Sequence, residues 1–273
     1  MIGTELLLVL AGFVAGGFGA LLGLGGGILI VPILTLIFEA PLHTAIGTSL
    51  VSVIATSAGG SAHNVRTGRA DIRLGMTLAM AAVVGAFVGG TLAGVLPERA
   101  LAGLFAALLA WTAVTFARGL MRPYRTGPGG PTEPTLDPTA ADGAAAPPYR
   151  RRRLPAAFGG SFLAGNISGL LGVGGGSVTV PLIHLVQGAP LHVAVATSNF
   201  IIGITAAAGA YAYLFRGDVD PSIAGPVVLG VAVGAAGGAR LAARLRATWL
   251  SVLFLAVVTY TAVEMALRAI GGP

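Results

Sequence analysis

Two glycine-rich segments, 23–27 and 172–176, are the parts of this sequence best suited to chemistry. Glycine costs a helix about 1 kcal/mol per residue relative to alanine, so both segments are expected to interrupt helices. A backbone without side chains brings its N–H groups close to an anion. A helix restarting at Ile28 or Ser177 would point its positive dipole end at the same place. The residues assigned to this predicted anion site are Gly25, Gly26, Gly27, Gly174, Gly175 and Gly176.

Hydroxyl and amide side chains follow each glycine segment and complete the predicted site: Thr48 and Ser49 after the first, and Thr197, Ser198 and Asn199 after the second. Pro41 and Pro190 suit the first turn of a helix, so these residues would lie about 10 Å into it. Neutral donors can bind an oxyanion without burying a countercharge. The alternative is that the hydroxyls bond to carbonyls of the preceding turn. The sequence leaves both open.

Three other polar residues lie near these segments: His43, His192 and Asn166. The histidines precede the threonines near predicted helix starts, which suits either an interfacial position or a role in proton coupling. Asn166 precedes the second glycine segment, and a buried asparagine needs partners, so it would brace the break or contact the ligand.

Other kinds of site find no support in the sequence. There is no cysteine, no cluster with metal-ligand spacing, no paired carboxylates and no pairing of a nucleophile with a base. The first glycine segment lacks the acidic residue about 20 positions on that a dinucleotide-binding motif needs. We therefore predict no metal, no cofactor and no enzymatic activity.

The composition places these motifs in a lipid bilayer. The chain has 273 residues, of which 55% are hydrophobic and 10% charged, with a mean hydropathy of +0.88. A soluble domain carries about 25% charged residues, and a spanning helix needs roughly 20 apolar ones. We predict an all-α, polytopic helical membrane protein. Its uncharged runs cover 6–38, 44–62, 74–97, 100–117, 154–215, 221–239 and 247–263.

The sequence repeats itself at an offset of 149 residues, well beyond the glycines. Val31-Pro32 returns as Val180-Pro181, and Asp71 returns as Asp220. We predict a first transmembrane repeat at 1–117, a Pro- and Arg-rich cytoplasmic linker at 118–153 and a second transmembrane repeat at 154–273. A further repeated set fits close helix packing better than ligand binding: Gly85, Gly89, Gly234 and Gly238.

The arginines predict how the chain is oriented. They account for the net charge of +6 and lie in loops between spans, where they set topology rather than bind nucleic acid. With the linker in the cytoplasm, thirteen of the sixteen arginines lie inside and both termini lie outside. The loop at Arg69 is then inside and its counterpart at Arg216 outside, so the two repeats are inverted.

Inverted repeats need an odd number of crossings in each half. Each half has three clear spans, and the remaining run of 33 residues, 6–38, is too long for one straight helix. At about 1.5 Å per residue it would overshoot a bilayer core of roughly 30 Å. Each repeat is therefore predicted to hold a glycine-broken helical hairpin and three transmembrane helices.

The paired glycine segments, each followed by Val-Pro and then Thr-Ser, resemble the TauE/SafE family of membrane permeases. This family is also described as sulfite exporters or toluene-sulfonate uptake permeases. The resemblance covers nearly the whole chain apart from the central linker, which is unusually long for the family. It implies secondary transport of sulfite, sulfonates or related organic anions.

These observations predict a secondary transporter in the plasma membrane of a prokaryote. It would move small anions by alternating access around a site between the glycine breaks. The expected partners are a small anionic substrate, the lipid bilayer and a coupling proton or cation, with a homo-oligomer left open and nucleic acid not expected. The alternatives are a passive anion channel and a membrane scaffold or receptor that transports nothing.

Overall fold

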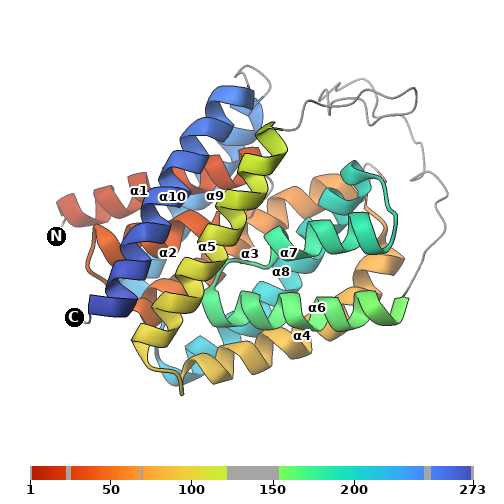
Figure 1. Ribbon diagram of the computed structural model, residues 1–273. Coiled ribbons are helices and arrows are strands. Elements are labelled where there is room, and N and C mark those ends of the chain that lie inside the picture. Colours follow the sequence, from red (N-terminus) through yellow and green to blue (C-terminus); the bar gives the residue numbers. More distant parts are fainter. Residues whose placement is uncertain are drawn as a thin grey trace.

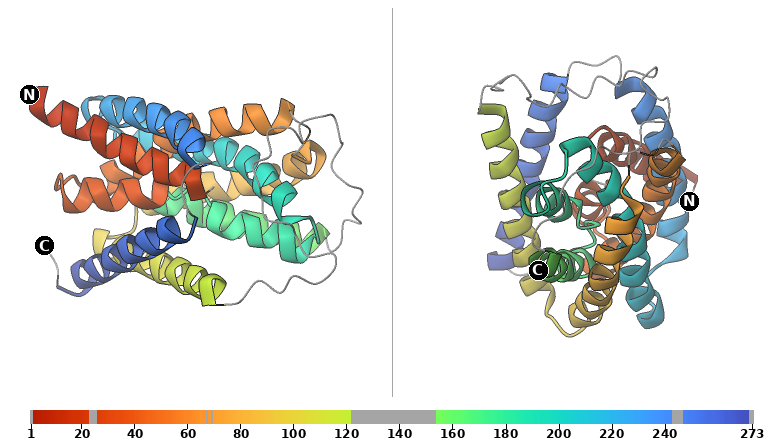
Figure 2. Two further views of the ribbon diagram at one scale, coloured as in Figure 1. Left: turned by 90° about the horizontal axis from the view of Figure 1, so that it is seen from above. Right: turned by 90° about the vertical axis from the view of Figure 1, so that its right-hand side faces the viewer.

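The fold is a bundle of helices (Figures 1 and 2). The computed structural model describes residues 2–22, 26–66, 68, 70–121, 154–242 and 247–271, and within those ranges every regular element is a helix. Six helices are long and apolar enough to cross a membrane, which confirms the predicted all-α, polytopic membrane protein. The first half contains α1 (Ile2–Leu22), α2 (Gly27–Leu36), α3 (Leu42–Arg66), α4 (Ile72–Ala93) and α5 (Glu98–Met121). The second contains α6 (Leu154–Leu171), α7 (Gly176–Pro181), the π-helix η1 (Leu182–Val186), α8 (Leu191–Arg216), α9 (Pro221–Ala242) and α10 (Ala247–Gly271).

Each helix of the first half has a counterpart in the second. The predicted broken hairpins are α1–α2 and α6–α7–η1, and three helices follow each of them. Helices α2 and α7 begin at Gly27 and Gly176, one residue before the predicted restarts. The first four residues of the predicted linker 118–153 continue α5, and 122–153 lie outside the described residues.

The two halves are intertwined, because α1 lies along α9 and α4 lies along α6 (Figure 1). Glycines permit these contacts. A Cβ atom at Gly85 or Gly89 of α4 would overlap backbone carbonyls of α6, and one at Gly234 of α9 would overlap a carbonyl of α1. These three glycines therefore serve helix packing, as interpreted from the sequence. The surroundings of Gly238 are outside the described part of the structure.

Two of the counterpart pairs, α3 with α8 and α5 with α10, pack in antiparallel fashion. Gly47, near the start of α3, lies against Tyr213 near the end of α8, whereas Ser57 further along α3 reaches Asn199 near the start of α8. Helices α5 and α10 also pair this way, with Gly103 beside Ala269. The two helices of each of these pairs thus run in opposite directions, as an inverted repeat requires. Their orientation in a bilayer stays a prediction.

The repeated aspartates are helix caps. The Asp71 carboxylate accepts a hydrogen bond from the Leu74 backbone N–H at 2.9 Å, at the start of α4. The Asp220 carboxylate accepts bonds from the Ser222 hydroxyl at 2.7 Å and the Ser222 N–H at 2.9 Å, at the start of α9. The hydroxyl bond, followed by the N–H bond, lowers the pKa of Asp220. Their recurrence is explained by helix geometry and not by ligand chemistry.

Candidate functional site

The structure brings the two glycine breaks into contact, and Ser49 of α3 joins them. Its hydroxyl donates to the carbonyl oxygen of Gly172 at 2.7 Å, and a longer contact of 3.3 Å reaches the carbonyl oxygen of Gly27. A Cβ atom at Gly27 would meet the Gly172 carbonyl, so only glycine allows the two backbones to approach so closely. The two glycine breaks, 145 residues apart in the chain, therefore form one contact region in the structure.

The backbone at both breaks is left-handed. Gly26 has a φ of 74°, and in the second break Gly172, Gly174 and Gly175 have φ values of 71°, 81° and 72°. Other L residues are strained by roughly 1–2 kcal/mol in this conformation. The segment 172–176 is buried throughout, as are Gly26 and Gly27, whereas Gly25 lies outside the described residues.

Two of the predicted hydroxyls are enclosed and have no hydrogen-bond partner among the residues that the structure describes. Thr48 and Ser198 are both 0% exposed, and neither the Thr48 Oγ1 nor the Ser198 Oγ is bonded. Other buried hydroxyls, such as those of Thr112 and Thr261, donate to a carbonyl one turn earlier in their own helix. The alternative left open by the sequence, bonding to the preceding turn, is not adopted by Thr48, Ser49, Thr197 or Ser198.

The other two polar residues of the predicted set connect the two halves. Thr197 Oγ1 accepts a hydrogen bond from the Asp71 N–H at 2.9 Å, which ties α8 to the start of α4. The Asn199 backbone carbonyl accepts a bond from the Ser57 hydroxyl of α3. These contacts lie at one end of the antiparallel α3–α8 pair.

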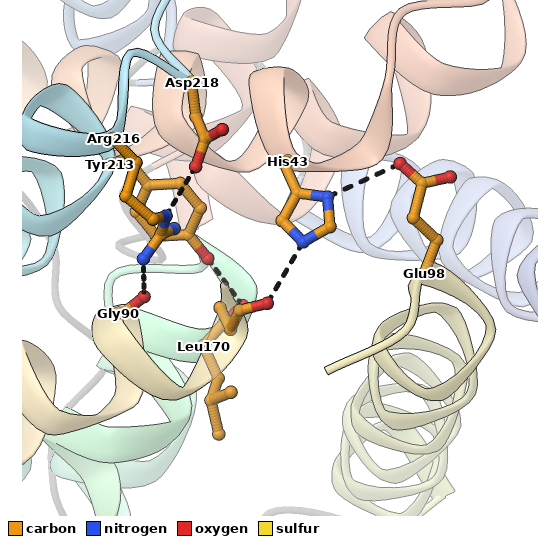
Figure 3. A network of polar contacts seen from close by, with 8 residues as sticks. His43, Gly90, Glu98, Leu170, Tyr213, Arg216 and Asp218 are labelled. Atoms are coloured by element: carbon orange, nitrogen blue, oxygen red, sulfur yellow. Dashed lines mark hydrogen bonds and ion pairs between the residues drawn. The ribbon is translucent and has the colours of Figure 1, made fainter. Parts of the chain in front are cut away.

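His43 lies at the opposite end of that pair, one helical turn before Ile46, which contacts Gly172 of the second break. Its Nε2 is 3.0 Å from the Ala93 carbonyl oxygen and its Nδ1 is 3.4 Å from a Glu98 carboxylate oxygen (Figure 3). Both partners are hydrogen-bond acceptors, so each contact needs a proton on the ring nitrogen that makes it. His43 therefore connects α3 to the end of α4 and the start of α5.

The remaining two support residues are His192 and Asn166. His192 belongs to the first turn of α8, and its side chain is not described. The Asn166 backbone lies against Gly85 and Gly89 of α4. Its partly exposed side chain makes no hydrogen bond to the described residues of the second break.

A second group, which the sequence did not predict, leads from the surface to the breaks; we call it the arginine network. Arg216 donates to the Gly90 carbonyl and, through Nε, to the Asp218 carboxylate at 2.7 Å (Figure 3). Its guanidinium lies 4.5 Å from the ring centre of Tyr213, which is fully buried. The Tyr213 hydroxyl donates at 3.1 Å to the carbonyl of Leu170, two residues before Gly172. The sequence pattern that could have indicated this network is a tyrosine, Tyr213, one helical turn before an arginine, Arg216.

Within the described residues, the glycine breaks coincide neither with a group of metal-binding side chains nor with the surface groove between α5 and α10. No group of three or more metal-binding side chains occurs among the described residues. A groove of about 760 Å³ lies between α5 and α10 and is lined almost entirely by small and aliphatic side chains. None of the predicted site residues lines it.

Comparison with known proteins agrees with this architecture. A "Probable membrane transporter protein YunE" of Bacillus subtilis is 29% identical over 221 residues, covering 78% of this chain and 80% of that protein. The "Probable membrane transporter protein YdhB" of the same organism is 27% identical, covering 86% and 89%. In the archaeon Methanocaldococcus jannaschii, the "Probable membrane transporter protein MJ0441" is 28% identical, covering 76% and 72%.

No solved structure matches the chain. Residues 8–265 match the family described as "Sulfite exporter TauE/SafE", which is nearly the whole sequence. Both glycine-rich segments, the Thr-Ser pairs and five of the six candidate spans fall within this match, and the sixth, Phe254–Gly271, extends past its end. The chain therefore belongs to the TauE/SafE family of membrane transporters.

Proposed function

We propose that this protein is a secondary transporter that moves small oxyanions, such as sulfite or sulfonates, across the plasma membrane of a prokaryote. The observation that carries the proposal is the pair of enclosed, unpartnered hydroxyls of Thr48 and Ser198 in helices that adjoin two touching glycine breaks. A buried polar group without a partner costs about 1–3 kcal/mol. An oxyanion that accepts a hydrogen bond from either hydroxyl would recover that cost.

The chemistry of the cluster favours an anion recognised by neutral donors. Hydroxyls, and the backbone N–H groups of Gly26, Gly27 and the segment 174–176, can all donate to oxygen atoms spread over a sulfonate or sulfite group. A fixed arginine or lysine at the same place would bind the anion more tightly but also slow its release. The family description and the names of the relatives support transport, and the anion class follows from this donor set and the family description.

Contacts at the two ends of the α3–α8 pair suggest how access alternates. The arginine network and His43 hold one end, and the bonds from Asp71 to Thr197 and from Ser57 to Asn199 hold the other. Opening one end while the other stays joined would expose the enclosed hydroxyls to one side only. Antiparallel counterpart helices are the arrangement that such an exchange needs.

The proposed orientation keeps the linker in the cytoplasm. Thirteen of sixteen arginines then lie inside, and the end held by the arginine network faces outward. The first residues of α1 and the last residues of α10 lie on the same side of the molecule in Figures 1 and 2, which agrees with both termini lying on one side of the membrane.

Purified protein in proteoliposomes tests the proposal. Sulfite, sulfate, thiosulfate and methanesulfonate would be screened by thermal shift, and the anions that stabilise the protein would be assayed for uptake and counterflow. We expect saturable uptake with counterflow, and an apparent affinity about tenfold weaker in the double variant Thr48→Val, Ser198→Ala. Thr112→Val, which removes a hydroxyl bonded within its own helix, is the matched control and should leave uptake unchanged.

Two results would contradict the proposal. Flux that does not saturate and shows no counterflow would indicate a passive channel. Absence of flux for every anion, with the double variant behaving like the wild type in thermal shift, would indicate a scaffold or receptor.

A further inference from the structure

Buried polar groups without partners are concentrated in the second half of the molecule. Apart from Thr48 and Ser198, all such side chains among the described residues lie between 161 and 187. We call them the polar row: Ser161, Ser168, Ser177 and Gln187. Ser161, Ser168 and Gln187 are 0% exposed, and both the oxygen and the nitrogen of the Gln187 amide lack a partner.

The first half has no equivalent of the polar row. The residues 149 positions earlier are Gly12, Gly19, Ile28 and Phe38, none of which has a polar side chain. The repeat therefore explains the glycine breaks and the Thr-Ser pairs but not this set. The second half carries a property of its own.

The two serines of α6 lie on one side of that helix. They are seven residues apart, which leaves them within about 20° of each other around the helix axis. Gly165 and Gly169 face α4. Gly160 and Ala164 face the second arm of the helical hairpin, which contains α7 and η1. Ser161 and Ser168 lie in the sector between these two contact faces and are directed into the protein interior.

The other two residues extend the polar row along the hairpin. Gly175 lies against Ser168, and Leu182 lies over Gly160, so α7 and η1 run back along α6 toward its first residues. Ser177 therefore lies beside the break, and Gln187, five residues beyond Leu182, lies at the far end. Between them lies the π-helix η1. The π-helix is a rare form, and where it occurs it is often part of a functional site.

The physical state of these groups points to an occupant. Buried polar side chains nearly always have a partner, and each exception destabilises the folded protein. Four exceptions in one hairpin call for something that both accepts and donates hydrogen bonds. A small oxyanion with its accompanying water satisfies hydroxyls and an amide, and a wholly apolar occupant does not.

We propose that the polar row is the cytoplasmic half of the substrate path, along which a small oxyanion passes between the second glycine break and the cytoplasm. This inference rests on the proposed transport function and on the arginine-based orientation, which places the first residues of α6 at the cytoplasmic face. The equivalent positions of the first half carry no polar side chain, so the polar row has no counterpart in the other repeat.

Cysteine accessibility tests the path without relying on transport rates, because the natural chain contains no cysteine. The full-length single variants Ser161→Cys, Ser168→Cys and Gln187→Cys would be exposed to (2-sulfonatoethyl) methanethiosulfonate, a membrane-impermeant sulfonate that modifies thiols. We expect modification from the cytoplasmic side in inverted vesicles, slowed at least about threefold by saturating methanesulfonate. Thr112→Cys, in a helix at the edge of the bundle, should not react. Modification from neither side would overturn the proposal.

Stability and uptake together exclude a merely structural role. Replacing an unsatisfied buried amide by an apolar group of similar shape should leave the melting temperature unchanged or raise it. For the double variant Ser168→Ala, Gln187→Met we expect an unchanged or raised melting temperature. We also expect an approximately tenfold rise in the KM for the transported anion. A fall in melting temperature with unchanged KM would overturn the path and assign a packing role.

The two hypotheses fail in different ways. If the wild type transports none of the four anions, the proposed function fails. If the wild type transports an anion and the double variant does so with the same KM, only the path fails.

Discussion

The two Thr-Ser pairs are identical in sequence and opposite in structure. In the first half Ser49 is bonded, to the carbonyls of both glycine breaks, while Thr48 is enclosed and free. In the second half Thr197 is bonded, to the N–H of Asp71, while Ser198 is enclosed and free. One hydroxyl of each pair holds the structure and the other keeps its hydrogen-bonding capacity.

Equivalent residues of the two Thr-Ser pairs therefore have different roles, although the motif is the same. Ser49 and Ser198 occupy the same position in their repeats, yet only the surroundings of Ser49 offer acceptors. An inverted-repeat transporter needs such inequivalence, because its two halves must differ in conformation at any moment for access to be one-sided. The comparison can be tested one pair at a time.

The largest expected effect is at the point where the two breaks touch. Gly172 and Gly188 have nearly the same φ, 71° and 72°, but a Cβ at Gly172 would meet Ile46 atoms at 2.9 Å while one at Gly188 meets nothing within 4 Å. Gly188→Ala should cost only the backbone strain, about 1 kcal/mol. Gly172→Ala should cost about 3 kcal/mol or more, since overlap adds to strain.

Melting temperatures of both variants in detergent would measure this difference. Equal losses would mean that the second break is not packed against α3 as described. The joining of the two breaks by Ser49 would then be in doubt as well.

A smaller effect is expected for the two serines. Ser49→Ala removes the donor shared by the Gly27 and Gly172 carbonyls and should destabilise the protein by about 1–2 kcal/mol. Ser198→Ala removes a hydroxyl with no partner and should change stability by no more than about 0.5 kcal/mol. Melting temperatures with and without a stabilising anion separate the two roles. Comparable destabilisation by both substitutions would mean that the pairs are equivalent.

The smallest effect is expected for the two threonines. Thr197→Val removes the acceptor for the Asp71 N–H at the start of α4 and should cost about 1 kcal/mol. Thr48→Val should be neutral for stability, because its hydroxyl has no partner, and should weaken only the anion-induced thermal shift. If Thr48→Val lowered the melting temperature as much as Thr197→Val, the free state of Thr48 would be refuted.

Much of the fold could be predicted because it depends on local chemistry. Clustered glycines end a helix whatever surrounds them, so the broken hairpins and the starts of α2 and α7 were predicted to within one residue. Long apolar runs predicted the spanning helices for the same reason. The packing role of Gly85 and Gly89 was also readable, since small residues at spacing four favour close helix contacts.

The missed residues depend on contacts between distant segments. Tyr213 is an ordinary aromatic residue in an apolar run until the Leu170 carbonyl is placed beside its hydroxyl. Gln187 looks like a loop residue, yet the return of the hairpin encloses it. For His43 the sequence left an interfacial position and proton coupling open, and the structure places it where the ends of three helices meet.

The sequence alone determined that this is a duplicated helical membrane protein with a glycine break in each half, because composition, periodicity and glycine propensity act locally. Only the tertiary structure decided that the breaks touch, that Ser49 joins them and that Thr48 and Ser198 stay free. The reason is that a hydroxyl takes whichever acceptor lies within about 3 Å, and that distance is set by how helices far apart in the chain pack together.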